Sequence, residues 1–235
     1  MNSINPIELK MENIKTMFQY AKKIASECDD IDAIIKHLEN TDPEFRSVGY
    51  EGVAMCLALK NFSPGESPRT NNNPLKLWNS LLSVSPNHSP QIHIGLGWAI
   101  AESKPIDLTF LDAVNSMMQF RVWDGCGYYD GIFRQRQTIK NQLRNDIVKE
   151  KNFKAYDEGI GRSLWYSCKG DPAKVSGMIQ TFSSSRHADL WRGVGIACSY
   201  VGGSDDNILK NIFSLSGKHS IQLKTGAVMI AKSRS

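Results

Sequence analysis

The densest group of polar and aromatic side chains in this sequence lies between Arg121 and Phe133. It holds two carboxylates, Asp124 and Asp130, and the aromatic side chains Trp123, Tyr128 and Tyr129. Two nearby carboxylates can act as general acid and general base, and aromatic rings supply flat apolar contact area with a polar edge. We therefore predict that this segment forms the rim of a ligand pocket, with Asp124 and Asp130 as its catalytic pair.

The same segment also has a purely structural interpretation. Its three glycines, at positions 125, 127 and 131, are of a residue type that interrupts helices and strands, so a turn-rich loop is expected here. In that case the aspartates cap backbone N–H groups, and the aromatic side chains fill an interface between two halves of the chain. The sequence leaves both interpretations open.

A second polar cluster lies at 155–166. Gly159 and Gly161 precede a helical pattern, but the third glycine and the preceding strand of a dinucleotide-binding fingerprint are missing, which favours a glycine-capped turn. Arg162 follows in a helix that is expected to enter the core. Because a buried guanidinium requires a carboxylate partner, the sequence offers Asp124, Asp130 or Asp157.

Other types of chemistry find little support. The five histidines form no HxxxH or HExxH pair, so we predict no metal site. We find no GxSxG motif and expect no cofactor. The five cysteines are an odd number without a CxxC pair, which indicates reduced thiols.

The segment 134–151 is the most basic part of the chain. It holds six basic residues, among them Arg134 and Arg144, and two acidic ones. Helical proteins that bind nucleic acid use such faces, but aromatic side chains are not interleaved here as nucleic-acid contacts would favour. We therefore expect a solvated face, and we regard nucleic-acid binding as the weakest functional hypothesis.

Apolar residues recur at three- and four-residue spacing along most of the chain, whereas sustained alternation is missing, so the fold is predicted to be all-α. Asp30 and Asp171 are expected helix caps. Four glycine-led apolar segments, at 52–59, 95–101, 193–201 and 226–231, are predicted helices. Glycine in a helix costs about 1 kcal/mol relative to alanine, which close packing of these helices in an inner layer would offset.

The chain contains an internal similarity. His88–Gly95 resembles His219–Gly226 at an offset of 131 residues, and six of 19 ungapped pairs are identical, where roughly one is expected. Gly52–Met55 matches Gly193–Ile196 at an offset of 141, and the difference falls in the loop Asn61–Asn73. We predict a helical-repeat-like bundle built from two duplicated halves related by a pseudo-two-fold axis.

Length and composition agree with a single compact unit. The chain has 235 residues, 41% of them hydrophobic and 22% charged, and a formal net charge of +4, which is typical of a globular protein. Within it we expect a helical half at 1–133, a polar connecting helix or linker at 134–152 and a second helical half at 153–235. No signal peptide or membrane span is predicted, so the expected compartment is the cytoplasm.

Four segments resemble successive blocks of a bacterial family of unknown function that occurs mainly in enediyne and related polyketide biosynthetic gene clusters. These are Tyr50–Met55, Asp124–Phe133, Gly159–Trp165 and Ala188–Gly195, and the similarity extends over about residues 20–235. The second block departs from the family pattern at Cys126, where an aromatic residue is expected, and at Tyr129, where a histidine is expected. The resemblance implies a role in natural-product biosynthesis but supplies no reaction.

From the residues and the resemblance together, we predict an accessory protein of polyketide-type biosynthesis that binds an apolar, polyene-like small molecule at the junction of the two halves. The sequence leaves open whether the protein is an enzyme that transforms this ligand. The ligand-binding side chains are expected to be Trp123, Tyr128, Tyr129, Arg162, Trp165, Trp191, Tyr50 and Glu51, beside the catalytic pair. The alternative is a non-catalytic helical-repeat module that docks a protein of the biosynthetic cluster.

Overall fold

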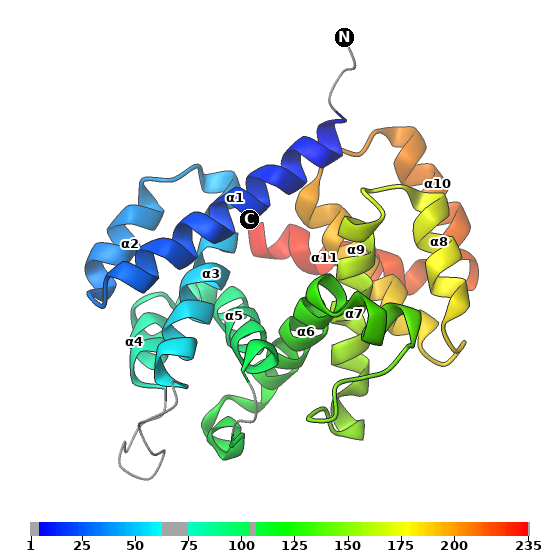
Figure 1. The fold of residues 1–235 in the computed structure, drawn as a ribbon. Coiled ribbons are helices and arrows are strands. Elements are labelled where there is room, and N and C mark those ends of the chain that lie inside the picture. Colours follow the sequence, from blue (N-terminus) through cyan, green and yellow to red (C-terminus); the bar gives the residue numbers. More distant parts are fainter. Residues whose placement is uncertain (1–4, 63–74, 104–106, 235) are drawn as a thin grey trace. The chain divides into compact units, whose positions relative to one another are not determined.

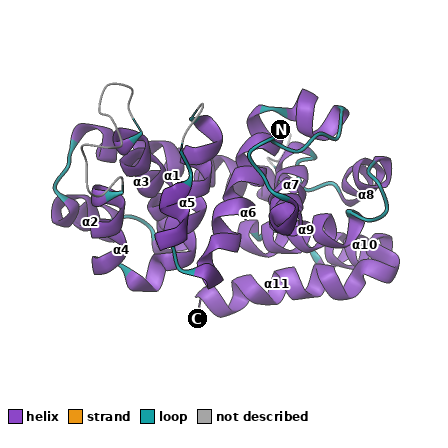
Figure 2. Ribbon diagram, turned by 90° about the horizontal axis from the view of Figure 1, so that it is seen from below, coloured by secondary structure: helices purple, strands orange, loops and turns teal. Residues whose placement is uncertain are grey.

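The computed structural model describes residues 5–62, 75–103 and 107–234 of the chain (Figure 1). Within these ranges the backbone forms helices and connecting turns and no strand, which confirms the predicted all-α class (Figure 2). Most of the expected loop Asn61–Asn73 lies outside the described residues.

The α-helices are α1 (Pro6–Glu27), α2 (Ile31–Glu39), α3 (Pro43–Asn61), α4 (Lys76–Val84), α5 (Ser89–Glu102), α6 (Ser116–Phe133), α7 (Phe153–Ser167), α8 (Pro172–Thr181), α9 (His187–Val201), α10 (Asp206–Ser216) and α11 (Ser220–Arg234). Short helical turns are η1 (Pro86–His88), η2 (Thr109–Ala113), the π-type η3 (Arg136–Lys140), η4 (Glu150–Asn152) and η5 (Gly217–His219). None of the described helices combines the length and apolarity required to cross a bilayer.

The chain divides into two compact units. The first unit is 13–126, and the second unit is 1–12 together with 127–235. The division falls inside α1 and inside α6, so each of these helices contributes one part to each unit.

The predicted aspartate caps are confirmed. The side chain of Asp30 accepts hydrogen bonds from the backbone N–H groups of Asp32 and Ala33 at the start of α2. Asp171 accepts the corresponding bonds from Ala173 and Lys174 at the start of α8. Each carboxylate satisfies amide groups that have no partner within the helix, and it also opposes the positive end of the helix dipole.

In the first unit, α3 packs between α1 and α5. A β-carbon added at Gly52 would lie 2.6 Å from the carbonyl oxygen of Phe18 on α1, so α1 and α3 approach closely at this point. Helix α5 is buried along 91–101. Its Gly97 meets α6 at the backbone of Val122 and Cys126, and Gly125 of α6 meets the backbone of Ile94. A side chain at either glycine would separate the two helices.

In the second unit, α9 packs between α7 and α11. Gly193 of α9 meets the carbonyl oxygen of Glu158 on α7, and Gly226 of α11 meets the carbonyl oxygen of Arg192 on α9. Figure 2 shows α11 along the edge of this unit, beside α9 and α10. The glycine-led segments are therefore helices whose glycines permit close approach of neighbouring backbones.

One inter-helix contact recurs in both units. Gly95 of α5 meets the carbonyl oxygen of Glu51 on α3, as Gly226 meets that of Arg192. The two glycines are separated by the offset of 131 residues and their partners by the offset of 141 found in the sequence. The order of elements also recurs, since α2, α3, α4, η1 and α5 match α8, α9, α10, η5 and α11 in type.

Two local predictions were wrong. The segment Arg121–Phe133 is not a turn-rich loop but the continuous end of α6. Gly159 and Gly161 lie inside α7 and do not form a turn before it. The segment 134–152, expected to be a connecting helix or linker, contains the π-type turn η3, the turn η4 and irregular backbone. In α6 and α7 the glycines serve helix packing: Gly127 meets the backbone of Tyr156, and Gly161 meets that of Leu190.

Candidate functional site

The second unit contains a group of buried or half-buried charged and polar side chains, which we call the polar cluster. Its members come from the end of α6, the segment that follows, α7, and α9 with the residue before it: Asp130, Arg134, Arg144, Asn145, Tyr156, Asp157, Glu158, Arg162, Arg186, Asp189 and Arg192. They can meet because glycines bring the backbones of α6, α7 and α9 close together.

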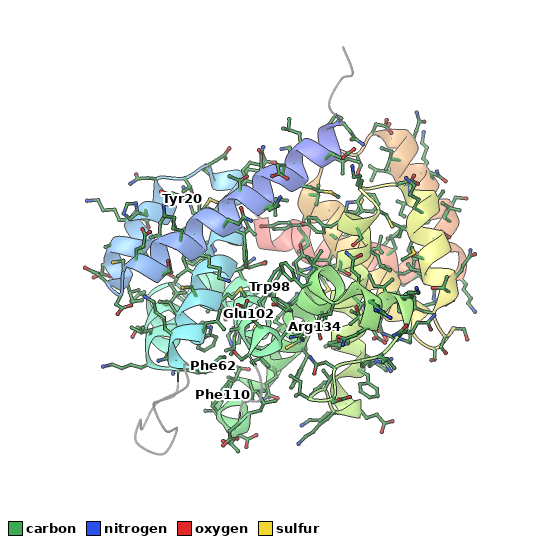
Figure 3. All side chains as sticks on the ribbon, in the orientation of Figure 1. Tyr20, Phe62, Trp98, Glu102, Phe110 and Arg134 are labelled. Atoms are coloured by element: carbon green, nitrogen blue, oxygen red, sulfur yellow. The ribbon has the colours of Figure 1, made fainter. Side chains whose placement is uncertain are left out.

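Asp130 is 1% exposed and accepts hydrogen bonds at both of its carboxylate oxygens. Arg134 donates from Nη1 to Oδ1 over 2.6 Å, while Oδ2 accepts from Asn145 Nδ2 at 3.0 Å and from Tyr156 Oη at 2.7 Å. Figure 3 labels Arg134, which follows directly after α6. These bonds fasten the segment 134–145 to α6 and α7. The catalytic role expected for Asp130 stays a prediction.

Asp157 holds two arginines. Arg144 donates from Nε and Nη2 over 3.1 and 2.5 Å, and Arg186 donates from Nε and Nη2 over 3.0 and 2.6 Å. Arg186 also donates to the carbonyl oxygen of Gln142 over 2.8 Å. Paired hydrogen bonds of this kind are strong and directional, so Asp157 joins the segment after α6 to the start of α9.

Two further carboxylates of the polar cluster, those of Glu158 and Asp189, share Arg192. Its guanidinium lies 2.6 Å from Asp189 Oδ1 and 3.2 Å from Glu158 Oε2, and the arginine side chain is 29% exposed. Burial raises the pKa of Asp189 above its usual value, and the positive charge of Arg192 opposes that rise.

Arg162 is a buried member of α7, as predicted, and is 5% exposed. Its guanidinium carbon lies 4.4 Å from the centre of the Tyr128 ring, in a cation–π contact. The Tyr128 ring in turn lies 5.6 Å from that of Tyr166. Of the three carboxylates offered by the sequence, Asp157 uses its oxygens for Arg144 and Arg186.

The other predicted residues of the second unit are Tyr129, Trp165 and Trp191. Tyr129 is half-buried, with its ring 4.7 Å from that of Phe133 and 5.5 Å from the guanidinium carbon of Arg134. Trp165 on α7 and Trp191 on α9 are buried at 0% and 3% exposure. The indole N–H of Trp165 has no hydrogen-bond partner among the described residues.

Four predicted residues belong to the first unit. Tyr50 and Glu51 are buried on α3, and the Tyr50 ring stacks on His88 at 3.8 Å. Trp123 and Asp124 are buried on α6, where Arg121 Nη1 lies 3.7 Å from Asp124 Oδ2.

The predicted acid and base pair does not share one side of α6. Asp124 and Asp130 stand six residues apart on this helix, so their side chains leave its axis in directions about 120° apart. In the ranges that the structure describes, no three His, Cys, Asp or Glu side chains gather closely enough to hold a metal ion.

The sequence analysis missed the roles of Arg144 and Arg186. Arg144 was assigned to an exposed basic segment, and Arg186 precedes α9 without a motif. Their shared partner Asp157 lies 13 residues from the first and 29 from the second. No helical or turn spacing links residues so far apart. The one sequence signal for these contacts was an acid such as Asp157 in a helix expected to enter the core, since a buried acid requires a cationic partner. With Arg134 and Arg144 turned toward internal carboxylates, the basic face available to a nucleic acid is reduced.

Comparison with known proteins identifies the family. A family model described as "Protein of unknown function (DUF1702)" matches residues 2–235, and the chain belongs to this family. No curated protein matches the chain, and no solved structure does.

Proposed function

We propose that this member of the DUF1702 family is a non-catalytic helical-repeat module that docks a partner protein on the outer side of α11. Polyketide-type natural-product biosynthesis, which the resemblance of its sequence blocks implies, is the proposed setting. The five cysteines are free thiols, which suits the reducing cytoplasm proposed as its compartment. The main observation in support of the docking proposal is the contrast between the exposed sides of α1 and α11.

The exposed side of α1 is polar from residue 12 onward, whereas Leu9 near the start of the helix is 50% exposed. Among residues 12–27 its exposed positions are charged or hydrophilic except for Tyr20 (Figure 3). They are Glu12, Asn13, Lys15, Thr16, Gln19, Tyr20, Lys23, Ser26 and Glu27. Helical-repeat proteins require terminal helices with such a polar outer side, because that side faces water.

The exposed side of α11 carries two apolar side chains, Ile221 and Val228, beside Lys224 and Thr225. We call Ile221, Lys224, Thr225 and Val228 the α11 stripe, since these residues follow the three- and four-residue spacing of one helix face. Ile221 is 71% exposed and Val228 is 66% exposed. The hydroxyl of Thr225 donates to the carbonyl oxygen of Ile221 over 2.8 Å, which leaves its methyl group for contact.

Helix α10 extends this apolar surface. Phe213 is 40% exposed and Leu209, one turn earlier on the same face, is 45% exposed. The ammonium group of Lys224 lies 4.5 Å from the centre of the Phe213 ring, so α10 and the α11 stripe form one surface. Contiguous exposed apolar surface is typical of interaction sites.

The contacts of the polar cluster also support a structural interpretation of the chain. The carboxylates of Asp130 and Asp157 accept hydrogen bonds from internal arginine, asparagine and tyrosine side chains at both of their oxygens. Such bonds fix the segment after α6 in place and leave these two groups less suited to proton transfer.

We also infer that the two halves arose by duplication and are related by a pseudo-two-fold axis. The matching backbone contacts of Gly95 and Gly226 support this inference. The duplication bears on function. If matching helices of the two halves differ in that one face is covered and the other is exposed, the exposed face is a candidate binding surface.

The test compares two charge substitutions at exposed apolar positions. Full-length protein is purified from its native host after mild cross-linking, as wild type, as Val228→Glu on α11 and as Tyr20→Glu on α1. We expect a partner protein in near-stoichiometric amount with wild type and with Tyr20→Glu. A buried charge in the centre of an interface is unfavourable, so Val228→Glu is expected to weaken binding by at least about tenfold.

Thermal melting of the purified proteins is the control, because both substitutions are at the surface and should leave the melting temperature within a few degrees of wild type. Equal retention of the partner by both variants would place docking elsewhere on the chain. Loss of the partner from Tyr20→Glu alone would contradict the assignment to α11.

Binding of an apolar, polyene-like small molecule is the second candidate function, with transformation of that molecule left open. It is favoured by Trp165, whose side chain is fully buried while its indole N–H has no described hydrogen-bond partner. A buried donor of this kind is available to a carbonyl or hydroxyl oxygen of a ligand. The nearby Arg162 and Tyr128 would provide cationic and aromatic contact.

Native mass spectrometry of the protein from its own host tests this candidate. A co-purifying metabolite that is retained by wild type and lost on Trp165→Phe, which removes the N–H but keeps an aromatic ring, would establish ligand binding. An unchanged apo mass in wild type would dismiss it.

A further inference from the structure

We infer that the partner segment bound by the α11 stripe is an amphipathic α-helix with acidic residues beside its apolar face. This inference rests on the proposed function and adds the chemistry of the partner. It starts from helix α5, the counterpart of α11 in the first unit, whose corresponding face is covered by another helix of the same chain.

The covering of α5 shows what kind of element fits this position in the repeat. Helix α6 crosses α5 where Gly97 meets the backbone of Val122 and Cys126, and where Gly125 meets the backbone of Ile94. Together with the packing of α5 on α3 and α4, this crossing leaves α5 buried along 91–101. The natural cover for this face is thus a helix that lies across it.

The offset of 131 residues places Thr225 at the position of Ile94 and Val228 at the position of Gly97. Both α11 residues are exposed, so this face has no such cover within the described residues. We assign the cover of this face to a helix of the partner protein proposed above.

The change from Gly97 to Val228 also sets the distance of the partner. A β-carbon at Gly97 would collide with the backbone of α6, so a helix cannot approach Val228 as closely as α6 approaches Gly97. The partner helix must lie at the ordinary interaxial distance of about 8–10 Å, where larger side chains fill the gap. We therefore expect leucine, isoleucine or methionine at positions i, i+3 or i+4, and i+7 of the partner.

The positive charges at the α11 stripe favour acidic residues on the partner helix. Lys224 lies within the stripe and Lys218 three residues before it, both are exposed, and the stripe itself contains no acid; the nearest acids in sequence, Asp205 and Asp206, lie at the start of α10. Acidic residues on the partner would complement this potential and speed association. A second copy of the chain that presented the same stripe would bring lysine toward lysine, so self-association through α11 is disfavoured.

Site-specific photo-cross-linking in the native host tests the inference. A benzophenone amino acid is introduced at Thr225 or Val228 in the full-length chain, and at Gln19 on the polar side of α1 as the control. Cross-linked peptides are then sequenced by mass spectrometry. We expect cross-links from both stripe positions to one partner segment, at residues spaced by three or four, with acidic residues adjacent to them.

The outcomes separate this inference from the proposed function. Cross-links from the stripe to a partner segment without helical spacing or acidic residues would overturn the inference and leave the proposed function standing. Intermolecular cross-links that join two copies of this chain would overturn the inference in favour of a second copy. Equal cross-linking from Gln19 and from the stripe, or none from either, would count against both. Unchanged melting temperatures of the labelled proteins exclude misfolding as the cause.

Discussion

Arg186 and Asp157 meet through two hydrogen bonds, Nε to Oδ2 at 3.0 Å and Nη2 to Oδ1 at 2.6 Å, with both side chains almost fully buried. The residues are 29 positions apart, on the residue before α9 and on α7. Because Arg144 binds the same carboxylate, one acid compensates two guanidinium groups. Asp157 and its two arginines therefore connect three segments of the second unit. Removal of the carboxylate would leave both guanidinium groups without this compensating charge.

We predict that Asp157→Asn lowers the free energy of unfolding by about 3–5 kcal/mol, because it leaves buried positive charge uncompensated. Urea denaturation measures this change. Asp146→Asn is the matched control at an exposed acid of the preceding segment and should shift stability by less than about 0.5 kcal/mol. Similar effects of the two substitutions would mean that the contacts of Asp157 contribute little.

Glycine-to-alanine substitutions should have opposite signs at Gly97 and Gly177. An alanine at Gly97 would collide with the backbone of Val122 and Cys126, so α5 and α6 must separate and stability falls. Gly177 lies on α8 with open space around the added carbon, and alanine there should raise stability by up to about 1 kcal/mol through helix propensity. Calorimetric melting of both variants tests the prediction, and a stabilising Gly97→Ala would refute the close crossing of α5 and α6.

The two aspartate caps should contribute similar stability. Asp30→Ala and Asp171→Ala are each expected to cost about 1 kcal/mol, because each removes an acceptor of two backbone N–H groups. The pKa of Asp171 is lowered, chiefly by the hydrogen bond from the backbone of Lys174. Its contribution is therefore present above the unfolded-state pKa and is lost as the pH falls through the folded-state pKa. Denaturation of both variants at neutral and acidic pH measures this, and a pH-independent cost of Asp171→Ala would contradict it.

His93 should make stability depend on pH below neutrality. Its side chain is 2% exposed, and its pKa is lowered by burial, although a hydrogen bond of 2.7 Å between Nδ1 and the carbonyl oxygen of Ser89 opposes that shift. The unfolded chain binds the proton at a higher pH than the folded chain. The free energy of unfolding is thus highest above the unfolded pKa of about 6.5 and declines as the pH falls through it.

The test compares wild type and His93→Gln in urea titrations from pH 8 to pH 5. We expect a smaller decline in the variant, which keeps a polar group but has no proton to bind. Parallel pH profiles would show that His93 does not carry this dependence.

Periodicity and capping residues made the helices predictable. The three- and four-residue spacing of apolar side chains indicated an all-α chain, and Asp30 and Asp171 marked the starts of α2 and α8. These signals are local, since they depend on residues within one or two helical turns. The offsets of 131 and 141 residues likewise anticipated the matching contacts of Gly95 and Gly226.

The prediction of a loop at Arg121–Phe133 was wrong for a physical reason. Glycine is an unfavourable helix residue in isolation, so Gly125, Gly127 and Gly131 indicated turns. In the folded chain Gly125 admits the backbone of Ile94 and Gly127 admits that of Tyr156, so close helix packing offsets the low propensity. A turn glycine and a packing glycine look alike until the neighbouring helix is known.

The sequence by itself determined the helical class, the caps, the internally similar segments and the burial of Arg162. Only the tertiary structure decided which charged and polar side chains meet, since Asp157 selects Arg144 and Arg186 across 13 and 29 residues, and Asp130 selects Asn145 and Tyr156. It also decided that Val228 is exposed while Gly97, 131 residues earlier, is covered. Partner choice and exposure depend on how helices cross in space, and no local spacing in the sequence encodes that crossing.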